Sequence, residues 1–71
     1  MTTKVTYESI STRIYDTEEG QPANNNNISY RMQDLDDYGR RGFALISTVT
    51  APTCDGTLII DTLARTTETD D

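Results

Sequence analysis

Two adjacent arginines, Arg40 and Arg41, are the strongest candidates for binding chemistry in this chain of 71 residues. A glycine flanks the pair on each side, in the segment YGRRGF. Guanidinium groups bind phosphate and carboxylate groups through paired N–H donors. Tyr30 and Tyr38 precede the arginines, and tyrosine rings stack on planar groups and on cations. These four residues form the candidate binding set for a nucleotide or another small anion.

The position of this segment limits what it can do in one chain. It follows an expected helix, and anions prefer helix N-termini, where backbone N–H groups point outward. At a helix C-terminus, Gly42 fits the left-handed C′ position and the arginines oppose the negative end of the helix dipole. The segment is therefore first a hinge between helix and strand. An anion site would need the arginine side chains of several subunits brought together.

Catalytic chemistry has few candidate residues. The chain has no histidine, and its only cysteine, Cys54, has no histidine base to activate it and no partner for a disulfide. Asp61 is unusual because it interrupts an apolar strand. We expect it to pair with Arg65 or Lys4 at an interface or a sheet edge. No sequence motif of a known catalytic site is present, so the chain is predicted not to be an enzyme.

Acidic residues suggest a cation site at only one place. Asp16, Glu18 and Glu19 are closely spaced, but the segment lacks the later glycine and glutamate of a calcium-binding loop. No metal and no cofactor are predicted.

The net charge of −6 argues against binding to nucleic acid through phosphate neutralisation. Acidity at this level is most simply a source of solubility. The alternative is that Asp34, Asp36 and Asp37 imitate the phosphates of a nucleic acid. The chain also contains no run of about 20 apolar residues that could span a membrane. We expect a cytoplasmic protein.

The first half of the chain predicts a strand, a loop and a helix. Residues 4–15 are rich in valine, isoleucine, tyrosine and threonine, which favour strands. Residues 16–27 contain Gly, Pro and four consecutive Asn, which predict a long loop. Residues 28–39 predict a helix with one apolar stripe, formed by Ile28, Met32, Leu35 and Tyr38 or Gly39.

Within the first strand, the apolar residues change parity. Val5 and Tyr7 alternate in phase, whereas Ile10 and Ile14 fall on the opposite face. Two interpretations remain open: a β-bulge near residues 8–9, or a strand with apolar residues on both faces.

The second half predicts a hairpin. Residues 43–50 and 57–65 are apolar and β-branched, and residues 51–56 contain the turn-forming pair Asp-Gly. Residues 66–71 have no large apolar side chain and are expected to form a disordered acidic tail. The fold class is therefore α+β. Residues 1–65 form one β-α-β-β domain, with a mostly antiparallel three-stranded sheet and one helix on one face.

The segment from the helix into the hairpin resembles a family of short bacterial and phage proteins classed as a domain of unknown function. That family has a helix ending in Leu-Gly, two variable residues, and then Gly-Trp-Glu-Leu-Val. The corresponding segment here is YGRRGFALI. Phe43 replaces the tryptophan of the family, Ala44 replaces its acidic residue, and Tyr38 replaces its leucine. The match covers residues 4–15 and 32–65, and the loop at 16–27 is an insertion. The resemblance implies a β-α-β-β fold and a bacterial or phage source.

One helix can cover only one face of the sheet. Ile46, Ile59 and Leu63 are expected on the other face, where water would reach them in a monomer. We therefore expect a homo-oligomer that buries these residues in an interface. The alternative is that the loop or the tail folds over that face.

Three functions remain open at the level of the sequence. The first is a non-catalytic binding protein that acts as a homo-oligomer and engages a host or defence component. The second is a protein that sequesters a nucleotide or other small anion at its subunit interfaces. The third is an acidic mimic of nucleic acid that inhibits a nuclease complex.

Overall fold

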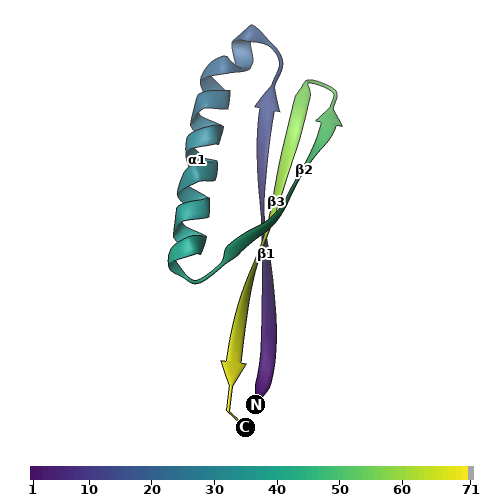
Figure 1. Cartoon of the computed structure of the whole chain (residues 1–71). Coiled ribbons are helices and arrows are strands. Elements are labelled where there is room, and N and C mark those ends of the chain that lie inside the picture. The colour runs from purple at the N-terminus through teal and green to yellow at the C-terminus, as the bar shows by residue number, and fades with distance from the viewer. Residues whose placement is uncertain (71) are drawn as a thin grey trace.

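The computed structural model describes residues 1–70. The molecule is long and thin, with dimensions of 55 × 21 × 11 Å. One long helix lies against a three-stranded antiparallel sheet (Figure 1). This arrangement confirms the predicted α+β class and the β-α-β-β order. The elements are β1 (Thr2–Tyr15), the short 3₁₀ helix η1 (Glu18–Gly20), α1 (Gln21–Arg40), β2 (Ala44–Thr53) and β3 (Gly56–Thr69).

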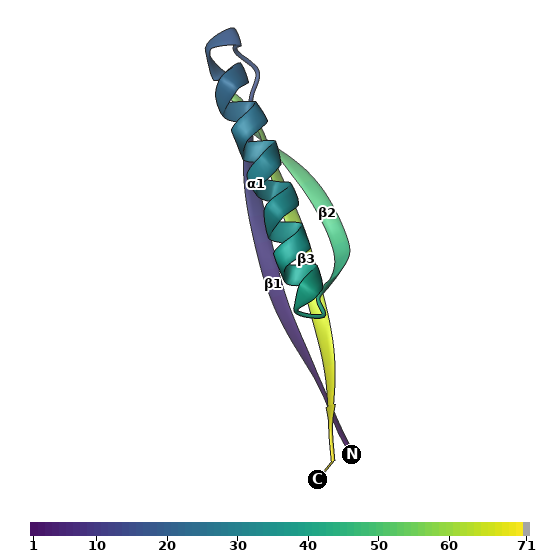
Figure 2. The same ribbon diagram turned by 90° about the vertical axis from the view of Figure 1, so that its left-hand side faces the viewer.

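The strand order is β1-β3-β2, so β3 is the central strand. β2 and β3 form the predicted hairpin, in which Thr53 pairs with Gly56 across a two-residue turn. Gly56 also lies close to β1, because a Cβ there would collide with the carbonyl oxygen of Ile14. α1 lies over one face of the sheet, and the view in Figure 2 shows β1 and β3 behind it. No helix of residues 1–70 covers the opposite face.

The prediction of a loop at residues 16–27 is wrong from Gln21 onward, because α1 begins there. Pro22 lies in the first turn, where its missing N–H costs no hydrogen bond. Asparagine is a poor helix former, but two residues of the Asn run bond to β1 through their side chains. Tertiary contacts therefore outweigh the local preference of this segment.

The prediction of a disordered tail at residues 66–71 is wrong for residues 66–69. β3 continues to Thr69, and this part pairs with the first residues of β1, from Thr2↔Thr69 to Val5↔Thr66. Threonine is β-branched and suits a strand without being apolar. Asp70 has no regular structure, and Asp71 lies outside the described residues.

The β-bulge predicted near residues 8–9 is also wrong. β1 pairs with β3 in an unbroken register, so the other interpretation is correct: β1 has apolar residues on both faces. The sheet has its irregularity in β2 instead, between Leu45 and Ser47, where Ile46 is the extra residue.

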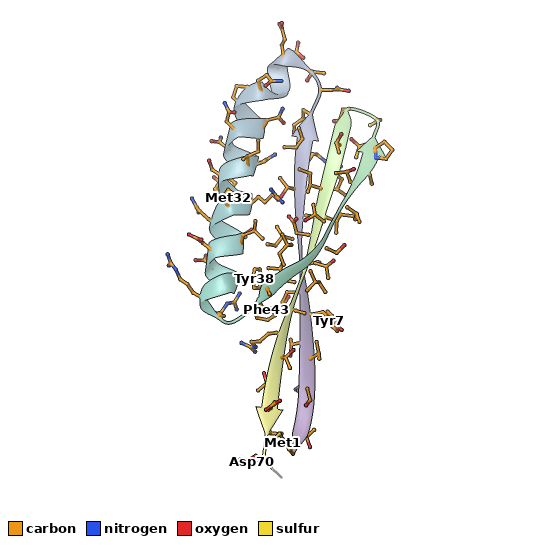
Figure 3. All side chains as sticks on the ribbon, viewed as in Figure 1. Met1, Tyr7, Met32, Tyr38, Phe43 and Asp70 are labelled. Atoms are coloured by element: carbon orange, nitrogen blue, oxygen red, sulfur yellow. The ribbon has the colours of Figure 1, made fainter. Side chains whose placement is uncertain are left out.

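The hydrophobic core is small. Ile10, Phe43 and Leu63 are the buried apolar residues, and Leu35 and Tyr38 of α1 pack against them. Figure 3 shows Tyr38 and Phe43 between the helix and the sheet. The predicted apolar stripe of α1 is correct at Leu35 but wrong at Ile28 and Met32, which are exposed. The helix is about 20 residues long, yet only its C-terminal half covers the core.

Candidate functional site

Polar side chains attach the N-terminal half of α1 to the edge of β1. The side-chain amide of Asn24 accepts a hydrogen bond from the Tyr15 backbone N–H (2.6 Å) and donates one to the Tyr15 carbonyl (2.7 Å). Three residues later, Asn27 Nδ2 donates to the carbonyl of Arg13 (2.8 Å). The Asn24 side chain thus makes the two hydrogen bonds to Tyr15 that a neighbouring strand would otherwise make. Local sequence does not reveal this role, because a run of asparagines next to Gly and Pro is typical of a loop.

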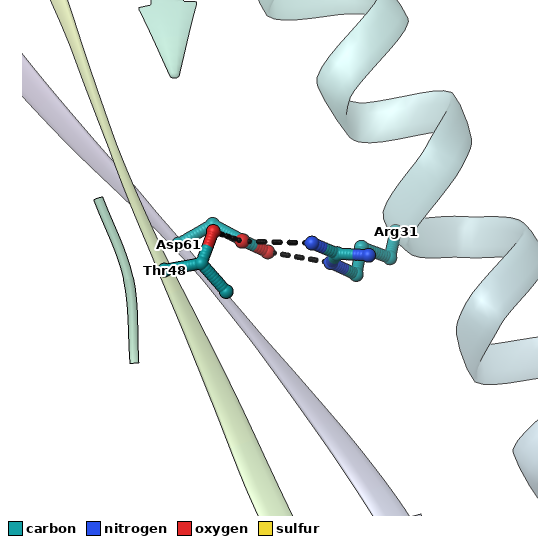
Figure 4. Close-up of polar contacts among 3 residues, drawn as sticks. All are labelled: Arg31, Thr48 and Asp61. Carbon is teal, nitrogen blue, oxygen red and sulfur yellow. Dashed lines mark hydrogen bonds and ion pairs between the residues drawn. The ribbon is translucent and has the colours of Figure 1, made fainter. Parts of the chain in front are cut away.

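A buried ion pair joins the middle of α1 to the central strand (Figure 4). Arg31 donates from Nε to Asp61 Oδ2 (2.7 Å) and from Nη2 to Asp61 Oδ1 (3.0 Å). The Thr48 hydroxyl of β2 donates to the same Oδ1 (2.8 Å). These contacts connect α1, β3 and β2 through one carboxylate.

The electrostatics of this pair favour the charged forms. The hydrogen bonds from Arg31 lower the pKa of Asp61, and the Thr48 hydroxyl and the arginine charge act in the same direction against the opposing effect of burial. The same bond raises the pKa of Arg31. A carboxylate held ionised in this way is a poor general acid or base. The pair is thus suited to holding the helix on the sheet.

The expected partners of Asp61, Arg65 or Lys4, are therefore wrong, and so is its expected place. Asp61 lies in the middle of the central strand with no exposed surface. The signal that could have identified Arg31 is its spacing of four and seven residues from Asn27 and Asn24, on the face of α1 that contacts β1.

Arg41 and Tyr38, two residues of the candidate binding set, lie together at the C-terminal end of α1. The Arg41 guanidinium lies 4.5 Å from the centre of the Tyr38 ring, which packs edge-on against Phe43. Arg65 of β3 lies 4.8 Å from the Phe43 ring and donates to the Arg41 carbonyl. Two cations and two rings thus form one cluster, which we call the arginine–aromatic cluster: Tyr38, Arg41, Phe43 and Arg65.

The other two residues of the set are elsewhere. Arg40 is exposed at the end of the helix and is in none of these contacts. Tyr30 lines a groove of about 260 Å³ between α1 and β1, beside Arg31 and Asp34. Since ten residues of helix span about 15 Å, one chain does not bring Tyr30 and Arg40 together. Gly42 has the expected left-handed backbone (φ 88°) and ends the helix, as the hinge interpretation predicts.

The face of the sheet away from α1 carries exposed apolar side chains. Register places Val5, Tyr7 and Val49 on this face, opposite to the face of Asp61, and each is largely exposed. Figure 3 shows Tyr7 pointing away from the helix. Around them lie half-buried apolar residues of β2 and β3. We call this surface the open face: Val5, Tyr7, Val49, Ala51, Leu58, Ile60 and Ala64.

The residues predicted for an exposed interface are mostly not on the open face. Leu63 is buried in the core and Ile59 is half-buried, and both belong to the helix side of β3. The expectation that water would reach Leu63 is therefore wrong. Ile46 is exposed, at the bulge of β2. The alternation of Ile59 and Leu63 with Leu58 and Ile60 is as expected, but the helix covers the face that also carries Asp61.

Other chemical groups are sparse in the described residues. Cys54 is a free, exposed thiol in the hairpin turn. Within residues 1–70, no three His, Cys, Asp or Glu side chains lie close enough to hold a metal ion. α1, the long helix of this part of the chain, is not apolar enough to cross a membrane. Asp34, Asp36 and Asp37 are exposed on α1.

Comparison with known proteins gives no relative. No protein-family model, no curated protein and no solved structure matches this chain. The β-α-β-β topology is the part of the family resemblance that the structure supports. The function must therefore be argued from the surface itself.

Proposed function

We propose that this protein is a non-catalytic binding protein that works as a homo-oligomer and binds another protein through its open face. The observation that carries the proposal is the open face itself. Valine and tyrosine side chains lie in water on a sheet whose whole core contains three buried apolar residues. Exposed apolar patches of this kind are typical of interaction sites.

The nature of the partner follows from the chemistry of that face. Val49 and Ile60 form an aliphatic pair on neighbouring strands. Tyr7 lies on the same face opposite Ala64, four residues farther along β3 than Ile60. Such a surface fits an apolar protein surface better than a charged polymer. The resemblance to the short bacterial and phage family implies a bacterial or phage source, and a host or defence protein as the partner is part of this proposal. Membership of that family is part of the same proposal.

The test compares two lysine substitutions at sites of similar exposure. Val49→Lys places a charge on the open face, where the native side chain is 52% exposed, whereas Met32→Lys changes the outer face of α1, where it is 56% exposed. A tagged protein incubated with bacterial lysate should retain its partner with Met32→Lys and lose it with Val49→Lys. Equal retention by both variants would contradict binding through the open face.

A second candidate function is the binding of a small anion at the arginine–aromatic cluster. The observation that favours it is that Arg41 and Arg65 bring two guanidinium groups to one pair of rings, and the buried Arg65 Nε has no hydrogen-bond partner among the described residues. Calorimetric titration with AMP tests it. Binding that disappears in Arg41→Ala, with the subunit number unchanged, would support this candidate.

A further inference from the structure

Between Thr3 and Ser9, no strand of the described residues pairs with the outer edge of β1. Hydrogen-bond directions alternate along an antiparallel strand. The backbone groups of Tyr15 and Arg13 that bond to α1 point away from β3. Every second residue of the strand therefore directs its backbone N–H and C=O to the same side, and these residues include Thr3, Val5, Tyr7 and Ser9. No other strand of residues 1–70 pairs with this edge. Asn24 and Asn27 bond to this edge only at Tyr15 and Arg13, near the C-terminal end of β1.

The lower part of the sheet is a two-stranded ribbon. β1 and β3 continue past the C-terminal end of α1, and β2 begins only at Ala44, opposite Ala64 (Figure 1). Two strands without a packed layer are marginally stable in water. An exposed edge of this kind is also a template for another strand. This ribbon would gain stability from a further strand on the β1 edge.

The sequence of the free edge is complementary to itself. When residues 3–9, TKVTYES, are paired antiparallel with a second copy about Thr6, Lys4 lies opposite Glu8 and Val5 lies opposite Tyr7. Thr6 then meets Thr6 of the other copy, and Thr3 meets Ser9. Opposite charges, β-branched and aromatic pairs, and Thr pairs are the cross-strand pairs that stabilise sheets.

Among these neighbouring registers, only the one centred on Thr6 places Lys4 opposite Glu8. Moving the axis to Val5 places Lys4 opposite Thr6, and moving it to Tyr7 places Lys4 opposite Ile10 and Glu8 opposite Thr6. Within one chain, Lys4 lies opposite Thr67 and Glu8 opposite Leu63, so neither has an opposite charge directly across the sheet. Both side chains are exposed.

We propose that two copies of this chain pair through residues 3–9 of β1, antiparallel about a two-fold axis at Thr6. The inference rests on the homo-oligomer in the proposed function and names its contact. The product is a continuous six-stranded sheet in the order β2-β3-β1-β1-β3-β2. Because opposite residues of an antiparallel pair share a face, the open faces of both copies lie on the same side and form one surface.

Charge exchange between two variants tests the contact. Lys4→Glu places two acids opposite each other at both ends of the pairing, and Glu8→Lys places two lysines there. Each variant alone should sediment as a monomer at concentrations where the wild type is a dimer, with a dissociation constant raised about tenfold or more. An equimolar mixture should restore the dimer, because every pairing is then Glu with Lys. Failure of the mixture to associate would overturn the proposed register.

Backbone hydrogen bonding is tested by a matched pair of prolines. Val5→Pro removes an N–H that points to the free edge, whereas Lys4→Pro removes one that bonds to β3. Val5→Pro should keep the native circular dichroism spectrum and lose the dimer, and Lys4→Pro should destabilise the fold itself.

In a Cys54→Ser background, Thr6→Cys should form a disulfide between subunits on oxidation, and Val5→Cys should not.

The outcomes separate this inference from the proposed function. A wild type that stays monomeric in native mass spectrometry at every concentration would overturn both the homo-oligomer and its contact. An oligomer that is unchanged by Lys4→Glu, Glu8→Lys and Val5→Pro would overturn the β1 contact and leave the homo-oligomer standing.

Discussion

Arg31 and Asp61 form one ion pair but differ in how much water each can reach. The Asp61 side chain has no exposed surface, whereas 24% of the Arg31 side chain is exposed. A buried charge that loses its partner is strongly destabilising, because neither water nor another group replaces the lost bonds. The two ends of the pair should therefore respond differently to mutation.

Arg31→Leu should cost about 3–5 kcal/mol of unfolding free energy, since it leaves the Asp61 carboxylate buried without its cation. Asp61→Leu should cost less, because the Arg31 side chain can turn its guanidinium toward water. The double variant should be more stable than Arg31→Leu alone. Urea denaturation measures all three, and equal losses for the two single variants would contradict this asymmetry.

The same pair makes stability depend on pH. The pKa of Asp61 is lower in the folded state, so the unfolded state binds more protons between the folded pKa and the ordinary value near 3.9. The contribution of Asp61 is complete above that ordinary value and is lost as the pH falls through the folded pKa. Acid titrations of unfolding should show a shallower loss in Asp61→Asn than in the wild type.

At the scale of elements, asparagine fixes α1 against the edge of β1. Asn24 makes two hydrogen bonds to the Tyr15 backbone, whereas its neighbour Asn25 is exposed. Asn24→Ala should cost about 2 kcal/mol, roughly 1 kcal/mol for each bond. Asn25→Ala should be neutral or slightly stabilising, because alanine favours helices. Thermal unfolding gives both values, and hydrogen exchange at the Tyr15 amide should rise only in Asn24→Ala.

The elements could be predicted from sequence wherever the local signal was strong. The Asp-Gly pair predicted the β2–β3 hairpin, and Gly42 predicted the end of α1. The start of α1 could not be predicted, because Asn24 and Asn27 gain their partners only when β1 lies beside them. The length of β3 depended in the same way on pairing with β1, since residues 66–69 carry no apolar pattern.

The candidate site was harder to predict than the fold. Local periodicity does not encode which face of β3 the helix covers. It also does not encode the bulge at Ile46, which places Leu45 and Val49 on opposite faces of β2. A wrong parity moves every side chain to the other face. Ile59 and Leu63 were therefore assigned to the interface in place of Ile60 and Val49.

At the scale of the whole molecule, stability and association are linked. Residues 1–70 contain three buried apolar side chains, so the core is small, and pairing of two ribbons would stabilise only the folded state. The midpoint of thermal unfolding should therefore rise with protein concentration over a roughly hundredfold range. Val5→Pro should abolish this dependence. Calorimetric scans at several concentrations measure it, and a constant midpoint in the wild type would contradict the link.

The strand order also governs when the molecule can fold. Among the described residues, β1 pairs in the sheet only with β3, and their pairing joins Thr2 to Thr69. Contacts between residues so far apart in sequence form slowly, because a long loop must close before any bond is gained. During synthesis, β1 leaves the ribosome before β3, so β1 has no strand to pair with until β3 has emerged. The hairpin of β2 and β3 is local, so it can form before β1 joins it and completes the sheet.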